Sequence, residues 1–126
     1  MAVHPTRQRK AIHQAIMLAP GPLSPNDILS LATQEVPKLG IATVYRTINL
    51  LLEAGDIQAV PINANDVRYE PCDRGHHHHF LCRVCNTVYD IKGCAGQIAK
   101  MLPADFEMDE HEILIHGTCA ECKTTD

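Results

Sequence analysis

The sequence has no long apolar run and no excess of positive charge. No stretch approaches the ~20 apolar residues that a membrane-spanning helix needs, and the start, MAVHPTRQRK, has no apolar segment behind its charges. We therefore expect a cytoplasmic protein without a membrane partner. Repeats and low-complexity tracts are also absent. With 45% hydrophobic and 21% charged residues, the composition excludes a disordered or collagen-like chain.

The net charge of -4 hides a difference between two parts of the 126-residue chain. Residues 1–60 hold five basic and four acidic residues, a net charge of +1. Residues 61–126 hold six basic and eleven acidic residues, a net charge of -5, together with all six cysteines and six of the eight histidines. Two modules with different roles are indicated, and we place them at residues 1–70 and 71–126.

The first module has the pattern of three helices followed by a hairpin. Capping residues, prolines and apolar spacing predict helices over residues 6–18, 25–33 and 42–54, then β segments over 57–62 and 67–70. This order is typical of a winged helix-turn-helix, whose third helix enters the major groove of DNA. Near the start of that helix, three outward side chains could contact DNA: Thr43, Tyr45 and Arg46. The alternative is that they are only the solvated face of a packed helix.

The second module is predicted to be mostly β-structure. We expect strands over residues 79–82, 87–91 and 107–116, and a short helix over 95–102. A module of about 50 residues has a small core, so dimerisation and bound metal are the usual supplements to its stability.

Two matched CxxC pairs, Cys82/Cys85 and Cys119/Cys122, are separated by 33 residues. A two-residue gap lets both thiolates of a pair reach one ion at ~2.3 Å, and two such pairs complete a closed tetrahedral zinc site. A redox-active CxxC or two disulfides are the competing interpretations, and they fit matched pairs in a reducing compartment less well. The pattern predicts a structural zinc ion.

Four consecutive histidines follow Cys72. On an extended strand His77 and His79 share one face, and His76 and His78 share the other. Pairing across the turn at residues 83–86 places Asp90 roughly opposite His79, with Glu70 and Cys72 on the preceding segment. Imidazole with thiolate favours zinc, whereas imidazole with carboxylates alone suits iron or manganese. The competing interpretation is a solvated histidine loop with Cys72 as a buried apolar thiol.

The second histidine face has fewer candidate partners. His111 could join His76 and His78, and Gln97 is a weak ligand. Cys94 has no partner that the sequence identifies.

Four segments together resemble the ferric uptake regulator (Fur) superfamily of metal-responsive repressors, in order and spacing over nearly the whole chain. They are residues 6–9 (TRQR), 40–47 (GIATVYRT), 76–85 (HHHHFLCRVC) and 116–122 (HGTCAEC). The resemblance implies an α+β chain, with a winged-helix DNA-binding domain before a small α/β dimerisation domain. It also implies a homodimer that binds palindromic double-stranded DNA operators in a metal-dependent way, not an enzyme with a small-molecule substrate.

Within the superfamily, RYEPC at residues 68–72 followed by HHHH looks most like the zinc uptake regulator (Zur) branch. The sensing ligands of that branch map onto Cys72, His77 and His79. Its acidic hinge ligand falls near Gln58, so Asp56 or Glu70 could take that place. A further site of the branch maps onto three histidines, with Gln97 where a glutamate is expected: His76, His78 and His111.

The iron and peroxide branches use ligands that map onto Glu70, His77, His79 and Asp90. They add a histidine before the second helix, where this chain has Pro22. We expect a zinc-sensing repressor of metal uptake genes, with Arg7 and Arg9 near DNA phosphates, Zn²⁺ in the structural site, and Zn²⁺, rather than Fe²⁺ or Mn²⁺, in the regulatory site. An iron-, manganese- or peroxide-responsive regulator is the alternative. A small zinc hydrolase is a remote one, since no nucleophile motif accompanies the histidines.

Overall fold

The computed structural model describes residues 6–94 and 96–124. The chain forms two compact units, Met1–Gly75 and His76–Asp126. The division falls after Gly75, so the segment following residue 70 goes with the first unit. Arg74 attaches this segment, because its guanidinium donates hydrogen bonds to the carbonyl oxygens of Met17 and Ala19 at 3.1 and 3.2 Å. Among the described residues, no helix is long and apolar enough to span a membrane.

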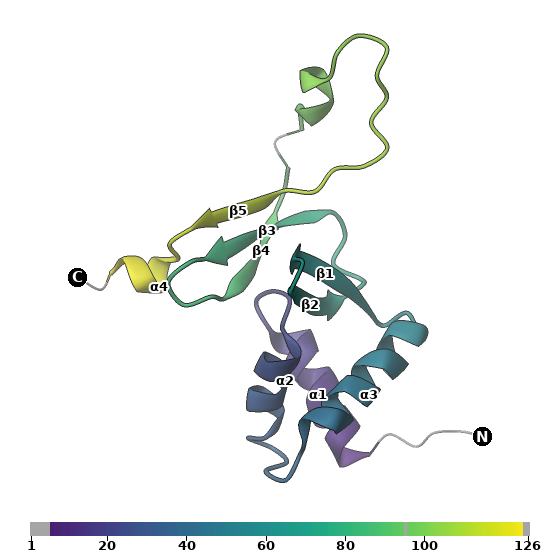
Figure 1. Cartoon of the computed structure of the whole chain (residues 1–126), viewed down its shortest axis with the longest axis vertical. Coiled ribbons are helices and arrows are strands. Elements are labelled where there is room, and N and C mark those ends of the chain that lie inside the picture. The colour runs from purple at the N-terminus through teal and green to yellow at the C-terminus, as the bar shows by residue number, and fades with distance from the viewer. Residues whose placement is uncertain (1–5, 95, 125–126) are drawn as a thin grey trace. The chain divides into compact units, whose positions relative to one another are not determined.

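The first unit begins with three packed helices, α1 (Arg7–Leu18), α2 (Pro25–Ala32) and α3 (Ile41–Glu53) (Figure 1). Local sequence explains where two of them start. The Thr6 side chain accepts a hydrogen bond from the backbone N–H of Arg9, 3.1 Å away. Ser24 and Asp27 form a reciprocal capping box, with both hydrogen bonds at 3.1 Å, and Pro25 occupies the first turn of α2.

Aliphatic side chains from all three helices meet in one core. Ile12 and Ile28 are both 0% exposed, and Ile48 of α3 is 1% exposed. The other buried members are Ala11, Ile16, Ala32, Leu39, Val44 and Ile57. This packing holds α3 with its buried stripe inward and leaves the opposite face of the helix open.

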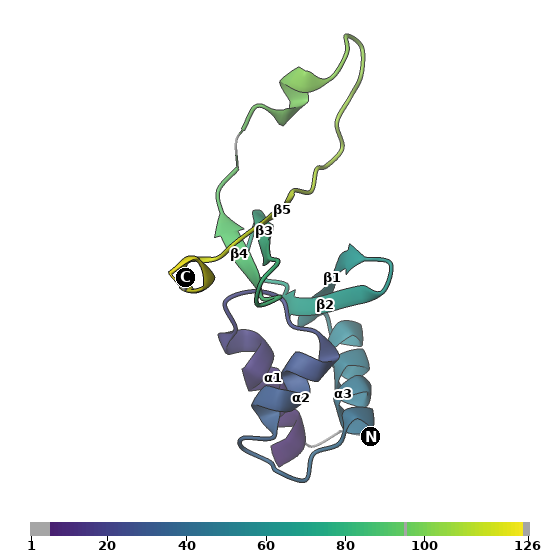
Figure 2. The same ribbon diagram turned by 60° about the vertical axis from the view of Figure 1, so that its left-hand side comes forward.

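A two-stranded antiparallel hairpin follows, β1 (Ile57–Asn63) and β2 (Asp66–Pro71). Leu23, just before α2, pairs with Tyr69 of β2 through backbone hydrogen bonds of 2.9 and 2.8 Å. The hairpin is thereby attached to the helices (Figure 2). The predicted winged helix-turn-helix is confirmed, and the helix boundaries agree with the sequence analysis to within a residue or so.

The second unit contains a three-stranded sheet in the order β4-β3-β5. Strand β3 (His77–Cys82) pairs antiparallel with β4 (Val88–Lys92) and parallel with β5 (Leu114–Gly117). The helix α4 (Ala120–Lys123) follows β5. The register sets His79 opposite Asp90, as the sequence predicted.

Two predictions for the segment between β4 and β5 were wrong. The helix expected over residues 95–102 is reduced to one 3-10 turn, η1 (Ile98–Met101); Ala95 lies outside the described residues. Gly96 has a positive φ of 74°, which opposes a helical start there. The strand expected over 107–116 begins only at Leu114, because residues 107–112 carry four acidic side chains and bring little apolar surface to a sheet.

The core predicts a large penalty for cavity formation in α2. Ile28→Ala should lower the free energy of unfolding of the first unit by about 2–5 kcal/mol, because the methylene groups of Ile28 are fully buried. Leu31→Ala, on the same helix but 41% exposed, should cost under about 1 kcal/mol. Urea unfolding followed by circular dichroism measures both, and equal losses for the two variants would contradict this core assignment.

Candidate metal centres and nucleic-acid interface

The four cysteines of the two CxxC pairs come together at one end of the second sheet. Cys82 ends β3, Cys85 lies in the following turn, and Cys119 and Cys122 flank the start of α4. Their sulfur atoms all lie within 4.8 Å of one another, with Cys85 Sγ and Cys119 Sγ 3.8 Å apart. The predicted four-cysteine cluster is confirmed. It fits a tetrahedral zinc ion with no open position, which makes its role structural.

Hydrogen bonds at this cluster favour thiolates at some positions and oppose them at others. The backbone N–H groups of Cys85 and Cys119 lower the pKa of the Cys82 thiol to about 6. The hydrogen bond with Cys119 raises the pKa of Cys122 to about 12. The Cys119 sulfur also raises the pKa of Tyr89 to about 12, since the phenol remains its hydrogen-bond donor. Four adjacent thiols cannot all ionise without a cation, and a zinc ion supplies the missing charge.

Strand β5 brings the second CxxC pair to the first. The backbone N–H of Arg83 donates to the carbonyl oxygen of Gly117 at 2.8 Å, and the N–H of Cys119 donates to Cys82 Sγ at 3.3 Å across 37 residues of chain. A Cβ at Gly117 would lie 3.1 Å from the Phe80 ring. The absence of a side chain at Gly117 therefore allows β5 to approach this closely.

A second group lies on one face of β3 and its neighbour β4. The Nε2 atoms of His77 and His79 lie 3.5 and 3.4 Å from Asp90 Oδ1, and their rings are 4.8 Å apart. Two imidazoles and a carboxylate oxygen directed at one point form three parts of a metal site. The sequence predicted these three residues as ligands, and the structure brings them together.

The remaining predicted regulatory ligands belong to the first unit. Glu70 on β2 is 1% exposed, and its carboxylate accepts a hydrogen bond of 2.9 Å from the side-chain amide of Gln58 on β1. Cys72 is exposed, and its backbone N–H donates to the carbonyl oxygen of Asp56 at 3.2 Å. Gln58 thus holds the carboxylate of Glu70, and the ligand roles of Glu70 and Cys72 remain predictions.

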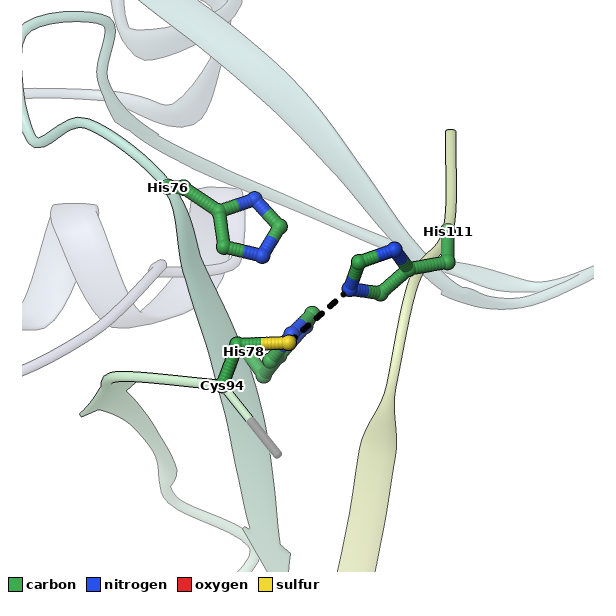
Figure 3. A group of neighbouring side chains, drawn as sticks. All are labelled: His76, His78, Cys94 and His111. Atoms are coloured by element: carbon green, nitrogen blue, oxygen red, sulfur yellow. Dashed lines mark hydrogen bonds between the residues drawn. The ribbon is translucent and has the colours of Figure 1, made fainter. Parts of the chain in front are cut away.

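The third group occupies the opposite face of β3 (Figure 3). His76, His78 and His111 come together as predicted, with ring centroids 4.7 to 5.0 Å apart. Cys94, to which the sequence assigned no partner, joins them. Gln97 is exposed. The signal that could have identified Cys94 is its position just after β4, the strand that pairs with the histidine run.

Burial alters the chemistry of one residue in this third group. His78 is 4% exposed, and burial together with the neighbouring His76 lowers its pKa. The imidazole of His78 is therefore neutral at physiological pH, which is the form that binds metal.

The predicted DNA-contacting residues lie where the sequence placed them. Tyr45 on α3 is 52% exposed, and the Arg46 guanidinium donates a 2.9 Å hydrogen bond to the Thr43 hydroxyl. Near the start of α1, Arg7 donates to the carbonyl oxygen of Glu35 at 2.9 Å, while Arg9 is half-buried. These residues form the exposed start of α3 and the adjoining end of α1, and their contacts with DNA remain predictions.

Comparison with known proteins identifies the family. Residues 1–116 match the ferric uptake regulator family. The chain belongs to this family. The ferric uptake regulation protein of Bacillus subtilis is 30% identical over 106 residues, which cover 79% of this chain and 71% of that relative.

Solved structures of this family have the same architecture. The ferric uptake regulator from Francisella tularensis, determined with iron, is 27% identical, with a TM-score of 0.72 over 98% of this chain and 96% of that chain. FurB from M. tuberculosis, described as a zinc uptake regulator, is 27% identical, with a TM-score of 0.51 over 94% of each chain. The protein is therefore a metal-sensing transcriptional regulator of the Fur family and not an enzyme. The predicted α+β fold class, with its zinc site, is confirmed.

The four-cysteine site predicts that Cys82→Ser loses one tightly held zinc ion. The second unit should then unfold or the protein become monomeric, because the ion joins the two ends of this small unit. Zinc analysis after exhaustive chelation and size-exclusion chromatography measure both effects. Val84→Ser is the control, since Val84 lies between two ligands but is 67% exposed. A stable Cys82→Ser dimer with unchanged zinc content would contradict the assignment.

Proposed function

We propose that this protein is a zinc-sensing repressor of metal uptake genes, which binds its double-stranded operator as a homodimer. The observation that carries metal sensing is the convergence of His77, His79 and Asp90 on one point, and the Cys72 thiol decides the choice of zinc. Three ligands leave at least one coordination position, which Cys72 or Glu70 of the first unit can fill. A site completed in this way differs from the closed four-cysteine cluster, because its occupancy can depend on the arrangement of the two units.

Two residues of the first unit, Cys72 and Pro22, favour zinc as the sensed ion. Cys72 offers an exposed thiol, a soft ligand that selects zinc over iron and manganese. Pro22 occupies the place of the histidine that the iron branch adds, and proline has no metal-binding side chain. Gln58 does not contribute to this preference, because it is neutral where the zinc branch has an acid and it donates a hydrogen bond to the buried Glu70. The similarity to FurB, a zinc uptake regulator, agrees with this choice.

Regulation follows from the different metal affinities of two conformations. A metal ion shifts an equilibrium only as far as it binds one arrangement more tightly than the other. We call His77, His79 and Asp90 the sensing trio, and α3 the recognition helix. An ion held by the sensing trio and by Cys72 or Glu70 favours one arrangement of the homodimer. In that arrangement the recognition helices of the two protomers meet successive major grooves. Arg7 and Arg9 then lie near phosphates. The second unit, which holds most of the negative charge, stays away from the DNA.

Iron or manganese sensing is the second candidate, and Asp90 is the observation that favours it. A carboxylate with two imidazoles suits Fe²⁺ and Mn²⁺ as well as zinc. The related regulator from Francisella tularensis was determined with iron. The two candidates differ in whether the Cys72 thiol is required.

Substitution of Cys72 distinguishes the two candidates. Cys72→Ser should abolish zinc-dependent DNA binding while the fold is retained, because the residue is exposed and contributes only its thiolate. The demetallated protein is titrated separately with Zn²⁺, Fe²⁺ and Mn²⁺ under reducing conditions. The probe is a double-stranded DNA selected from a random pool by the zinc-loaded wild-type protein, and binding is measured by fluorescence anisotropy.

The matched control is Asp73→Ser, which changes the next exposed residue and should respond to zinc like the wild type. Asp90→Asn should weaken the response to every metal. If Cys72→Ser keeps the wild-type zinc response, Cys72 is not the sensing ligand, and the zinc assignment fails.

Recognition of DNA is tested on α3. Arg46→Ala should weaken binding of the zinc-loaded protein to the selected DNA by about 1–3 kcal/mol, because an arginine at the start of a recognition helix contacts a guanine or a phosphate. Glu53→Ala, at the other end of the same helix, should change the affinity only slightly. Equal affinities of wild type and Arg46→Ala at several salt concentrations would remove Arg46 from the interface.

A further inference from the structure

The face of β3 opposite the sensing trio carries a complete set of four metal ligands, all within the second unit. His76, His78, Cys94 and His111 each offer one ligand atom, and these atoms lie within 4.8 Å of one another. Ligands around a tetrahedral zinc ion lie about 3.3–3.8 Å apart, given bonds of ~2.0–2.3 Å. Cys94 Sγ and His111 Nε2 are already 3.1 Å apart (Figure 3). The upper limit of 4.8 Å therefore exceeds the spacing in a closed zinc site by about 1 Å.

One atom of this group lacks a partner despite being buried. The residue His78 is 4% exposed, and its Nε2 atom has no hydrogen-bond partner among the described residues. A buried nitrogen without a partner costs free energy unless something binds it. The rings of His76 and His111 stand 4.7 and 5.0 Å from the His78 ring, so this nitrogen belongs to a cluster of donors rather than to an apolar pocket.

We propose that Cys94 completes this cluster as the fourth ligand of a third zinc site, made of three imidazoles and one thiolate. The sequence resemblance places Gln97, a weak ligand, where the zinc branch has a glutamate. The structure instead places the Cys94 sulfur among the histidines, and Gln97 is exposed. A thiolate in place of a carboxylate changes the metal preference of the site from iron or manganese to zinc.

The location of the ligands assigns this site a structural effect. Cys94 follows β4 and His111 precedes β5, so the two residues stand at the ends of the long excursion between these strands (Figure 1). His76 and His78 come from β3 and its approach. An ion that binds all four joins both ends of the excursion to the sheet, and it restricts the unfolded chain as any loop closure does. Occupancy of the site therefore stabilises the second unit without involving Cys72 or Glu70 of the first unit.

Cobalt spectroscopy tests whether Cys94 is a ligand. The four-cysteine site is first filled with zinc, and a Cys72→Ser protein is used so that Cys94 is the single thiol outside that site. Titration with Co²⁺ should then produce a sulfur-to-metal charge-transfer band in the near ultraviolet. Adding Cys94→Ser should remove that band and lower the zinc affinity of the site at least about tenfold. Zinc content measured on the same samples verifies that Co²⁺ has not displaced the structural ion.

Two further variants provide controls. Gln97→Ala should leave the band and the zinc affinity unchanged, because Gln97 is not a ligand. Cys94→Asp should bind metal without the band and shift the preference toward Mn²⁺. A Co²⁺ complex without a thiolate band in the Cys72→Ser protein, or a zinc affinity unaffected by Cys94→Ser, would overturn the proposal. None of these measurements uses DNA, so they stand apart from the test of zinc-dependent repression.

Discussion

Successive side chains of β3 point to opposite faces of its sheet, and the metal chemistry of the second unit depends on that alternation. On a helix, four consecutive histidines would point in directions about 100° apart and would form no such pairs. On this strand they divide into two pairs, one facing Asp90 and the other facing Cys94 and His111. The register with β4 and β5 then decides which donors complete each pair. A shift of that register by one residue would exchange the two faces and destroy both sites.

Much of the structure could be predicted from local signals. The capping box at Ser24 and Asp27, the apolar spacing of α3 and the matched cysteine pairs each act over a few residues, so the sequence shows them directly. The pairing of His79 with Asp90 followed from a short turn between their strands. The position of Cys94 just after β4 is a local signal, but its contact with His111 was not predictable, because only the parallel pairing of β5 with β3 brings His111 close. The predicted length of the last strand was also wrong, because the strand begins only at Leu114. The acidic residues before it contribute no apolar face that would favour a strand.

The donors are divided between the two faces of β3 by chemical type. The trio of His77, His79 and Asp90 contains a carboxylate, a donor that suits several divalent ions, whereas the group with Cys94 contains a thiol, a donor that suits zinc. The neutral to slightly basic first 60 residues carry the recognition helix, and the acidic remainder carries the metal ligands. Separation of charge along the chain therefore matches separation of tasks, and the negative total does not oppose contact with DNA.

The hydrogen bond from Cys119 to Cys82 Sγ spans 37 residues, and it has a consequence for biosynthesis. The core of the first unit is complete once its residues have left the ribosome, so this unit can fold while the rest of the chain is being made. Strand β3 leaves the ribosome soon afterwards. Its parallel partner β5 and the second cysteine pair, Cys119 and Cys122, are made only later. The sheet gains its third strand only when residues 114–117 have been made, and the four-cysteine site only when Cys122 has followed. Completion of the second unit therefore comes at the end of synthesis, and it requires the metal ion as well as the finished chain.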